Sequence, residues 1–295
     1  MPAADPIRVI LNPAAGHGAG WRRLKDLEEA SRKLGIEIIL DITRRPGHAS
    51  ELASRAARQG VKVVGVMGGD GTVGEVINGL VSSKTILGII GIGTGNDVAR
   101  SLGLPLNNPR RSLEVLLEGR VKNIDLGEAG GRYFVSVLGI GFPAEVAAEA
   151  NRISRFKGSI VFFLAMYKSL LRMKPVWLEL KYDGNEIEGY FTSLVVQNTP
   201  FTGGGLLIAP EAKLDDGLFD VVTVGEIRKI DLMINLPKLY RGNHLKHPQF
   251  SLVRCKSLEV RSQEKLPTMF DGDAFGSTPL KIKMRKQALR VIVEQ

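Results

Sequence analysis

An apolar strand followed by a glycine-rich loop and then a helix occurs three times in the first 125 residues, and this repeat constrains the fold most. The loops are Asn12–Gly18, Gly68–Thr72 and Gly93–Asp97, and each directly follows a run of aliphatic residues. Strands that alternate with helices are typical of a parallel, doubly wound sheet. Such sheets bind ligands beyond the carboxyl ends of their strands, so we expect all three loops to gather at one ligand-binding edge.

The pattern changes after about Asp125, where short strand-like runs separated by turn signals dominate. We therefore predict an α/β domain over residues 1–125 and a β-rich, sandwich-like domain over residues 126–295, with the last few C-terminal residues free to return to the first domain. The helices expected along the chain are Gly20–Leu34, His48–Gln59, Val73–Val81, Asp97–Leu102, Ala144–Met173 and Ile230–Arg241.

Composition excludes several classes of protein. Of the 295 residues, 44% are hydrophobic and 24% are charged, which excludes a mainly disordered chain. The net charge of +9 favours anionic partners. Nucleic acid is disfavoured as a partner, because no basic stripe carries interleaved aromatic residues. Cys255 is the one cysteine, so an internal disulfide is excluded and a reducing cytoplasm is expected.

Membrane spans are not expected. Asp5 and Arg8 interrupt the first residues, so we predict no secretory signal. The apolar run Ile160–Tyr167 is far shorter than the ~20 residues that a transmembrane helix requires. Any contact with a membrane would therefore be peripheral, and basic residues around that run within Asn151–Lys174 make it a candidate for contact with anionic lipid.

The stretch Gly68–Glu75 is the most informative part of the sequence. Its glycines let backbone N–H groups approach a bulky anion, and the helix that follows directs its positive end at the loop. Asp70 could hold a Mg²⁺ ion that neutralises phosphate charge. The alternative is an ordinary strand–helix connection in which Thr72 and Glu75 form a capping box. Three such loops are harder to explain as caps, and the standard P-loop and dinucleotide-binding signatures are both missing.

These motifs resemble the catalytic domain of the diacylglycerol kinase family. Gly68–Gly79 is similar to its GGDGT-x-x-E-x-x-N-G signature, and Gly93–Arg100 is similar to its GTGND element. Ala209–Leu218 matches the family's AP-x-A-x-x-DDG-x-L segment. The matches run in order from Asn12 to Asp273, which identifies the soluble bacterial lipid kinase branch.

The resemblance implies that ATP lies in a cleft between an α/β domain and a β-sandwich domain. It also implies the residues that would contact the nucleotide: Asn12, Pro13, Ala14, Ala15, Gly16, Thr43, Gly69, Asp70, Gly71, Thr72, Val73, Gly74, Glu75, Thr94, Asn96 and Asp97. Asp216 would bind a structural Mg²⁺ together with the carbonyls of Lys213 and Leu218. From the residues alone, Asp215–Gly217 also reads as an ordinary Asp-Gly turn.

The catalytic residues implied by the resemblance are Asp70, Asp271 and Asp273. The family has Asp-Gly-Glu where this chain has Asp271–Asp273, and its Glu is the general base for the lipid hydroxyl. Aspartate keeps the carboxylate but shortens its reach by roughly 1.5 Å. A second departure is Pro143, where the family usually has Asp.

The expected function is ATP-dependent phosphorylation of a lipid hydroxyl, with Mg²⁺, and diacylglycerol is the expected acceptor. Alternatives are an NAD kinase-like or other small-molecule kinase, and a nucleotide-binding regulatory protein with weak catalysis, which the shortened base at Asp273 suggests. We expect a cytoplasmic protein that meets the inner, anionic face of the membrane peripherally; a homodimer is compatible with the sequence. The sequence leaves open which lipid is the acceptor.

Overall fold

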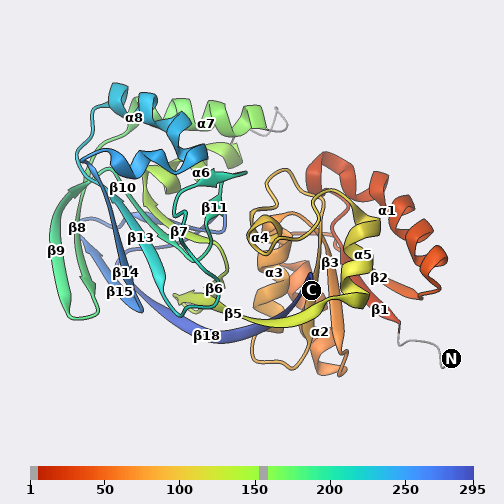
Figure 1. Ribbon diagram of the computed structural model, residues 1–295. Helices are drawn as coiled ribbons and strands as arrows, with labels where there is room; N and C mark the ends of the chain where they lie inside the picture. The colour runs from red at the N-terminus through yellow and green to blue at the C-terminus, as the bar shows by residue number, and fades with distance from the viewer. Residues whose placement is uncertain (1–5, 153–158) are drawn as a thin grey trace. The chain divides into compact units, whose positions relative to one another are not determined.

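The computed structural model describes residues 6–152 and 159–295 and divides the chain into two compact units (Figure 1). The first unit contains Met1–Ile124 and Gln287–Gln295, and the second contains Asp125–Lys286. Two strands cross the boundary between the units along the chain. They are β5 (Arg120–Ala129) and β18 (Leu280–Val293).

The first unit is built on a parallel sheet. Its strands β1 (Ile7–Leu11), β2 (Ile38–Ile42), β3 (Val63–Gly68) and β4 (Ile86–Gly91) lie in the order β2-β1-β3-β4. The end of β18 joins beside β4, also in parallel. The central strands are aliphatic along their length and buried, as expected for a sheet covered on both faces. The predicted α/β architecture with a parallel sheet is confirmed.

In the described part of the first unit, five helices connect these strands. They are α1 (Ala15–Leu34), α2 (His48–Arg58), α3 (Asp70–Leu80), α4 (Asp97–Ser101) and α5 (Pro109–Glu118). Two begin earlier than the sequence predicted, since α1 starts at Ala15 and α3 at Asp70, so both helices start inside the glycine loops. Helix α5 was not predicted. The sequence does indicate where this helix starts, because Asn108 can cap the helix and proline is common in the first turn. In the structure Asn108 caps the N–H of Arg111, and Pro109 occupies the first turn.

The second unit is an antiparallel sandwich. One sheet has the order β14-β13-β10-β7-β16-β17. In the other layer, the start of β18 pairs with β15, β15 pairs with β8, and β8 pairs with β9. The strands are β6 (Arg132–Phe134), β7 (Val137–Gly141), β8 (Val176–Tyr182), β9 (Asn185–Phe191), β10 (Ser193–Gln197), β11 (Phe201–Thr202), β12 (Leu206–Leu207), β13 (Phe219–Val224), β14 (Phe250–Cys255), β15 (Ser257–Ser262), β16 (Pro267–Phe270) and β17 (Asp273–Ser277).

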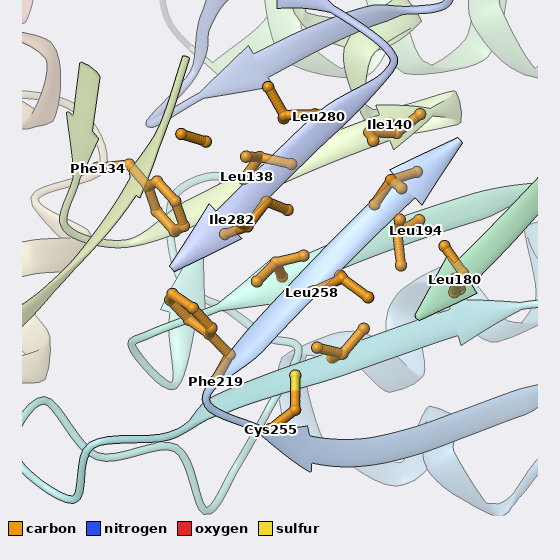
Figure 2. Packing of buried hydrophobic residues seen from close by; sticks show 14 of the residues in the cluster. Phe134, Leu138, Ile140, Leu180, Leu194, Phe219, Cys255, Leu258, Leu280 and Ile282 are labelled. Carbon is orange, nitrogen blue, oxygen red and sulfur yellow. The ribbon is translucent and has the colours of Figure 1, made fainter. Parts of the chain in front are cut away.

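The core of the second unit lies between the two layers (Figure 2). Phe134 stacks on Phe219 with ring centroids 5.7 Å apart and meets Phe270 edge to face at 5.6 Å. Alternation along β10 explains the layering, because Leu194 belongs to this core while Val195 belongs to a second cluster on the opposite face of the sheet. The predicted sandwich-like domain is confirmed.

Helices cover the outer face of the six-stranded sheet in the second unit. They are α6 (Phe142–Arg152), α7 (Ser159–Arg172), α8 (Lys229–Asn235) and the 3₁₀ turns η1 (Leu236–Arg241) and η2 (Asn243–Lys246). The predicted helical stretch Ala144–Met173 contains α6 and α7, and its residues 153–158 lie outside the described part of the chain. The predicted helix Ile230–Arg241 changes to 3₁₀ geometry where Pro237 removes a backbone donor. Within the described residues, no helix is long and apolar enough to cross a membrane.

Candidate functional site

The three glycine loops meet at one edge of the parallel sheet in the first unit. They follow β1, β3 and β4, which are neighbours in the sheet and run in the same direction. The pairing continues past the strand ends, since the N–H of Asn12 donates to the Met67 carbonyl and the N–H of Ile92 donates to the Gly68 carbonyl, each at 3.0 Å. The loops therefore start from fixed positions at the same edge, as the sequence predicted.

Two of these loops touch through glycines. A Cβ atom on Gly93 would lie 2.5 Å from the Cα of Gly69, and a Cβ on Gly69 would lie 3.2 Å from the Cα of Gly93. A Cβ on Gly68 would lie 2.7 Å from the Cβ of Thr72. Side chains at Gly68 and Gly93 would therefore force the backbone apart. The glycines of these loops are required by packing, in addition to any approach of a ligand.

Asp70 and Asn96 hold the same two loops together. One carboxylate oxygen of Asp70 accepts the N–H of Val98 at 3.0 Å, which ties the start of α3 to the start of α4. Asn96 has a left-handed backbone (φ 53°), and its buried amide accepts from the N–H of Gly93 and donates to the Gly93 carbonyl. Asp97 is buried beside it. The prediction that Asp70 binds magnesium stays a prediction, and the structure gives this carboxylate a positioning role as well.

Asn12 joins the first loop to the second. Its amide donates to the Thr72 hydroxyl at 2.9 Å, and its side-chain oxygen accepts the N–H of Ala14 at 3.0 Å. Thr43 lies alongside, because its N–H continues the pairing of β2 by donating to the Leu11 carbonyl.

The predicted capping box is wrong. Helix α3 has no side-chain cap, and Glu75 binds the start of α2 instead, accepting the N–H groups of Gly47 at 2.9 Å and Ala49 at 3.1 Å. The carboxylate thus stabilises a neighbouring helix whose start is distant in sequence, a contact that the local pattern could not indicate. The N–H of Val73 is also occupied, by the Gly69 carbonyl. The N–H groups of the first turn of an α-helix have no acceptor within the helix itself.

A cavity of about 520 Å³ adjoins the loops within the first unit. It brings together Gly16 and Thr94, two of the predicted nucleotide contacts, with Gly93. Arg22 and Arg23 of α1 also line it, and sequence reasoning missed both. Their positions could have indicated this, since both arginines lie about two turns into the helix that begins in the first glycine loop. The volume lies in the range of about 300–1,000 Å³ that small-molecule sites usually have.

In the second unit, the predicted metal-binding turn is held by a residue that the sequence reasoning missed. The carboxylate of Asp125 accepts the N–H of Gly217 at 2.7 Å, and its N–H donates to the Leu214 carbonyl. Asp125 is buried, whereas Asp216 is half-buried and accepts the N–H of Leu218 at 3.0 Å. Asp125 thus fixes the turn that presents the predicted metal ligands.

The oxygen ligands that this turn could offer fit a magnesium ion. They are the Asp216 carboxylate and the carbonyls of Lys213 and Leu218, and hard oxygen ligands of this kind suit Mg²⁺. Nearby, Asp220 has one buried carboxylate oxygen with no hydrogen-bond partner, while Arg254 binds the other at 2.9 Å. Burial raises the pKa of Asp220, and the charge of Asp216 raises it further, so a cation would relieve this negative charge. Within residues 6–152 and 159–295, no group of three acidic, histidine or cysteine side chains could hold a metal ion.

Asp271 and Asp273 have different surroundings. The carboxylate of Asp271 accepts the N–H groups of Val135, Ser136 and Val137 at 2.8–3.0 Å, so it anchors the strand edge beside it. Burial raises the pKa of Asp271, and these three donors oppose that effect. Asp273 is exposed, and Arg132 binds its carboxylate at 3.2 Å. Direct participation of Asp271 in catalysis stays a prediction, while its contacts show a positioning role.

His244 and Cys255 are structural residues of the second unit. His244 is fully buried, its Nε2 lies 3.0 Å from the Ile208 carbonyl, and burial lowers its pKa. Cys255 is buried in the core of the sandwich, and burial raises the pKa of its thiol to about 12.

Comparisons with known proteins cover nearly the whole chain. Residues 6–129 match the model of the diacylglycerol kinase catalytic domain, and residues 136–293 match that of the YegS C-terminal NAD kinase beta sandwich-like domain. A diacylglycerol kinase of Staphylococcus carnosus (strain TM300) is 30% identical over 96% of this chain and 94% of its own length. A diacylglycerol kinase of Bacillus subtilis (strain 168) is 28% identical over 92% and 91%.

Solved structures show the same fold. The crystal structure of a diacylglycerol kinase from Bacillus anthracis (strain Sterne) superposes with a TM-score of 0.74 at 23% identity, covering 98% of this chain and 97% of that one. A second structure from the same organism reaches a TM-score of 0.83 at 24% identity, with the same coverage. The sequence matches extend over both units, and on this basis the chain belongs to the diacylglycerol kinase family of enzymes.

Proposed function

We propose that this protein is an ATP-dependent lipid kinase that transfers the γ-phosphate of ATP to the hydroxyl of diacylglycerol, giving phosphatidic acid. One observation carries the proposal. In a member of this family, Gly69 and Gly93 bring the loops after two adjacent strands into contact, and Asp70 ties the start of α3 to the start of α4. Two helix starts held together in this way would supply the positioning and charge neutralisation on which phosphoryl transfer mainly depends.

The first unit would hold the nucleotide. The first turns of α1, α3 and α4 begin at these loops, and their N–H groups and positive helix ends favour phosphate. Arg22 and Arg23 add positive charge at the adjoining cavity. Asp70 would hold the Mg²⁺ ion bound with ATP. When bound, that ion neutralises phosphate charge during transfer.

Asp273 would be the general base that accepts the proton of the lipid hydroxyl. It is exposed enough to meet a substrate, and Arg132 keeps its carboxylate oriented. Arg132 is itself held over the ring of Phe275, at 5.0 Å from the ring centroid. The neighbouring Asp271 fixes the backbone that carries the base. Pro143 lies in the first turn of α6, where the lack of an N–H is tolerated.

A second candidate is an NAD kinase-like enzyme, and the description of the matched C-terminal model, an NAD kinase beta sandwich-like domain, favours it. A third is a nucleotide-binding regulatory protein with weak catalysis, which the shorter side chain at Asp273 favours. The order of the motifs and the homologues named diacylglycerol kinase support the lipid kinase over both.

A lipid kinase of this kind would act at the inner, anionic face of the membrane, from the cytoplasm. Helix α7 supplies part of such a contact: Tyr167 and Leu171 are exposed beside the basic residues Lys168 and Arg172. A nucleic-acid partner is not part of the proposal, and a homodimer is compatible with it.

We expect label from γ-labelled ATP to enter the lipid extract when the protein is mixed with diacylglycerol in detergent micelles. A panel with phosphatidylglycerol, a sphingoid base and an isoprenoid alcohol ranks the acceptors, and NAD is the water-soluble alternative. Label in NADP would support the second candidate. Binding of ATP without transfer to any acceptor would support the third.

Replacing Asp273 tests the base. Asp273→Asn keeps the shape but cannot take a proton, so kcat should fall by about 10²–10⁴. Asp273→Glu restores the side chain of the family motif and should keep or raise the rate. Glu188→Gln, an exposed carboxylate on β9, is the matched control and should turn over normally. If Asp273→Asn turns over like the wild type, the base lies elsewhere.

Magnesium should stabilise the second unit through Asp216, because an ion that binds only the folded state shifts the unfolding equilibrium. At a hundredfold excess over Kd the gain is about 2.7 kcal/mol. For a unit of this size, each kcal/mol of stabilisation raises Tm by about 2–4 °C. The measurement is thermal unfolding followed at Trp177 in a Trp21→Phe background, which removes the other tryptophan.

Asp216→Ala should lose most of this response, whereas Asp215→Ala, the adjacent exposed carboxylate, should keep it. If Mg²⁺ raises the Tm of Asp216→Ala as much as that of the wild type, the ion does not bind at this turn.

A further inference from the structure

An apolar strip lies on the outward face of α8 and η1 in the second unit. Ile230, Met233 and Ile234 are 54%, 45% and 58% exposed, and Tyr240 is 48% exposed. Single exposed apolar residues are common on protein surfaces. These residues are not single, because they follow one another within three helical turns and lie on the side opposite to the buried Leu232 and Leu239 of the same segment.

Helix α7 continues this strip. Figure 1 shows α7 and α8 on the same side of the second unit, and the side chain of Lys229 donates to the Leu171 carbonyl at the end of α7. Both helices pack on the same cluster below them, α7 through Leu170 and α8 through Leu232. Their outward faces are therefore adjacent. Leu164, Tyr167 and Leu171 of α7 extend the exposed apolar surface.

Basic residues surround this surface. Residues 164–174 and 228–241 contain seven lysines and arginines and one acidic residue, Asp231, giving a net charge of +6. Some of this charge is paired, since Glu149 of α6 binds Lys168 and Arg172, and Asp231 binds Arg228. Among the described residues, the exposed cations Lys174, Lys238 and Arg241 take part in no ion pair, so they keep their charge available.

Exposed apolar side chains bordered by unpaired cations match an anionic lipid bilayer, where the apolar groups enter the boundary of the acyl chains and the cations meet the headgroups. We propose that the outward face of α8 and η1, together with the end of α7, is a bilayer-inserting surface. This proposal rests on the proposed function for its choice of partner, since the enzyme must collect a lipid substrate. It adds an apolar insertion on α8 to the peripheral charge attraction expected of α7.

The two contributions respond differently to salt. Attraction between Lys238, Arg241 and anionic lipid weakens as the Debye length falls from about 10 Å at 0.1 M to about 3 Å at 1 M salt. Insertion of Ile230 and Ile234 is an apolar contact and does not weaken with salt. We therefore expect binding to anionic vesicles to fall but not vanish at high salt.

The test is co-sedimentation with vesicles of phosphatidylcholine alone and of phosphatidylcholine mixed with phosphatidylglycerol. Replacing both Ile230 and Ile234 by serine should lower the partition coefficient about tenfold or more and abolish the salt-resistant part. Replacing both Lys238 and Arg241 by glutamate should abolish the preference for anionic vesicles. The matched controls are Leu117→Ser, an exposed leucine on α5, and Lys265→Glu, and both should bind like the wild type.

Insertion itself can be read at Met233. Cys255 is buried and its thiol has a pKa of about 12, so a new surface cysteine can be labelled selectively. A polarity-sensitive dye on Met233→Cys should shift to shorter wavelength with anionic vesicles, whereas the same dye on Leu117→Cys should not. No shift at Met233→Cys, or unchanged binding of the double serine variant, would overturn the proposal.

Two further readouts separate this proposal from its rivals. If the surface instead joins two copies of the chain, the wild type will sediment as a dimer that the double serine substitution dissociates, and this result would also overturn the proposal.

Kinase activity on dispersed short-chain diacylglycerol should be equal in the wild type and the double serine variant, and only activity on vesicles should fall. Absence of lipid phosphorylation by the wild type in both assays, with vesicle binding retained, would reject the function and leave the surface intact.

Discussion

The contact between Gly69 and Gly93 is the constraint on which the first unit depends. With a Cβ on Gly93 only 2.5 Å from the Cα of Gly69, the loops after β3 and β4 can pack in this way only as glycine backbones. Asp70 and Asn96 then fix the loops by hydrogen bonds to the backbone of α4 and of Gly93. The same packing that closes the sheet edge gathers the starts of α3 and α4, where N–H groups lack helical partners. The proposed phosphate-binding surface would thus be a consequence of the fold.

Three carboxylates of this protein organise backbone that is distant in sequence. Glu75 binds the start of α2, Asp125 binds the turn at Gly217, and Asp271 binds three consecutive N–H groups. Asp125 fixes the turn that carries Asp216, and Asp271 fixes the backbone close to Asp273. We therefore expect loss of either carboxylate to lower activity by displacing the residue that it positions. Asp273 differs, because it is exposed and its partner is the side chain of Arg132.

Local patterns predicted elements whose cause is local. Helix α2 spans His48–Arg58 where the sequence predicted His48–Gln59, because its buried residues recur at helical spacing. The change from α/β to antiparallel structure near Asp125 was visible as a change of periodicity. The loops at Gly69 and Gly93 were predicted to meet, because parallel strands place their carboxyl ends together. The family followed from motif order.

Contacts between distant segments could not be predicted. The role of Glu75 in capping α2 depends on how α2 and α3 pack, and the local spacing of Thr72 and Glu75 indicated a different partner. Asp125 binds a turn some ninety residues later, and nothing around it in the sequence marks it as special. The adjacency of α7 and α8 depends on the sheet that both helices cover. These features arise from tertiary packing, which a single sequence does not reveal.

Hydrogen–deuterium exchange with and without ATP tests the central claim most directly, because it reports on the backbone N–H groups themselves. If the glycine loops form one phosphate-binding surface, ATP will slow exchange together in residues 12–16, 68–72 and 93–98, and inorganic triphosphate will reproduce much of this protection. Strands β8 and β9 of the second unit will be unaffected by triphosphate. Saturating ATP that leaves exchange in all three loops unchanged, or that protects only one of them, would contradict the account.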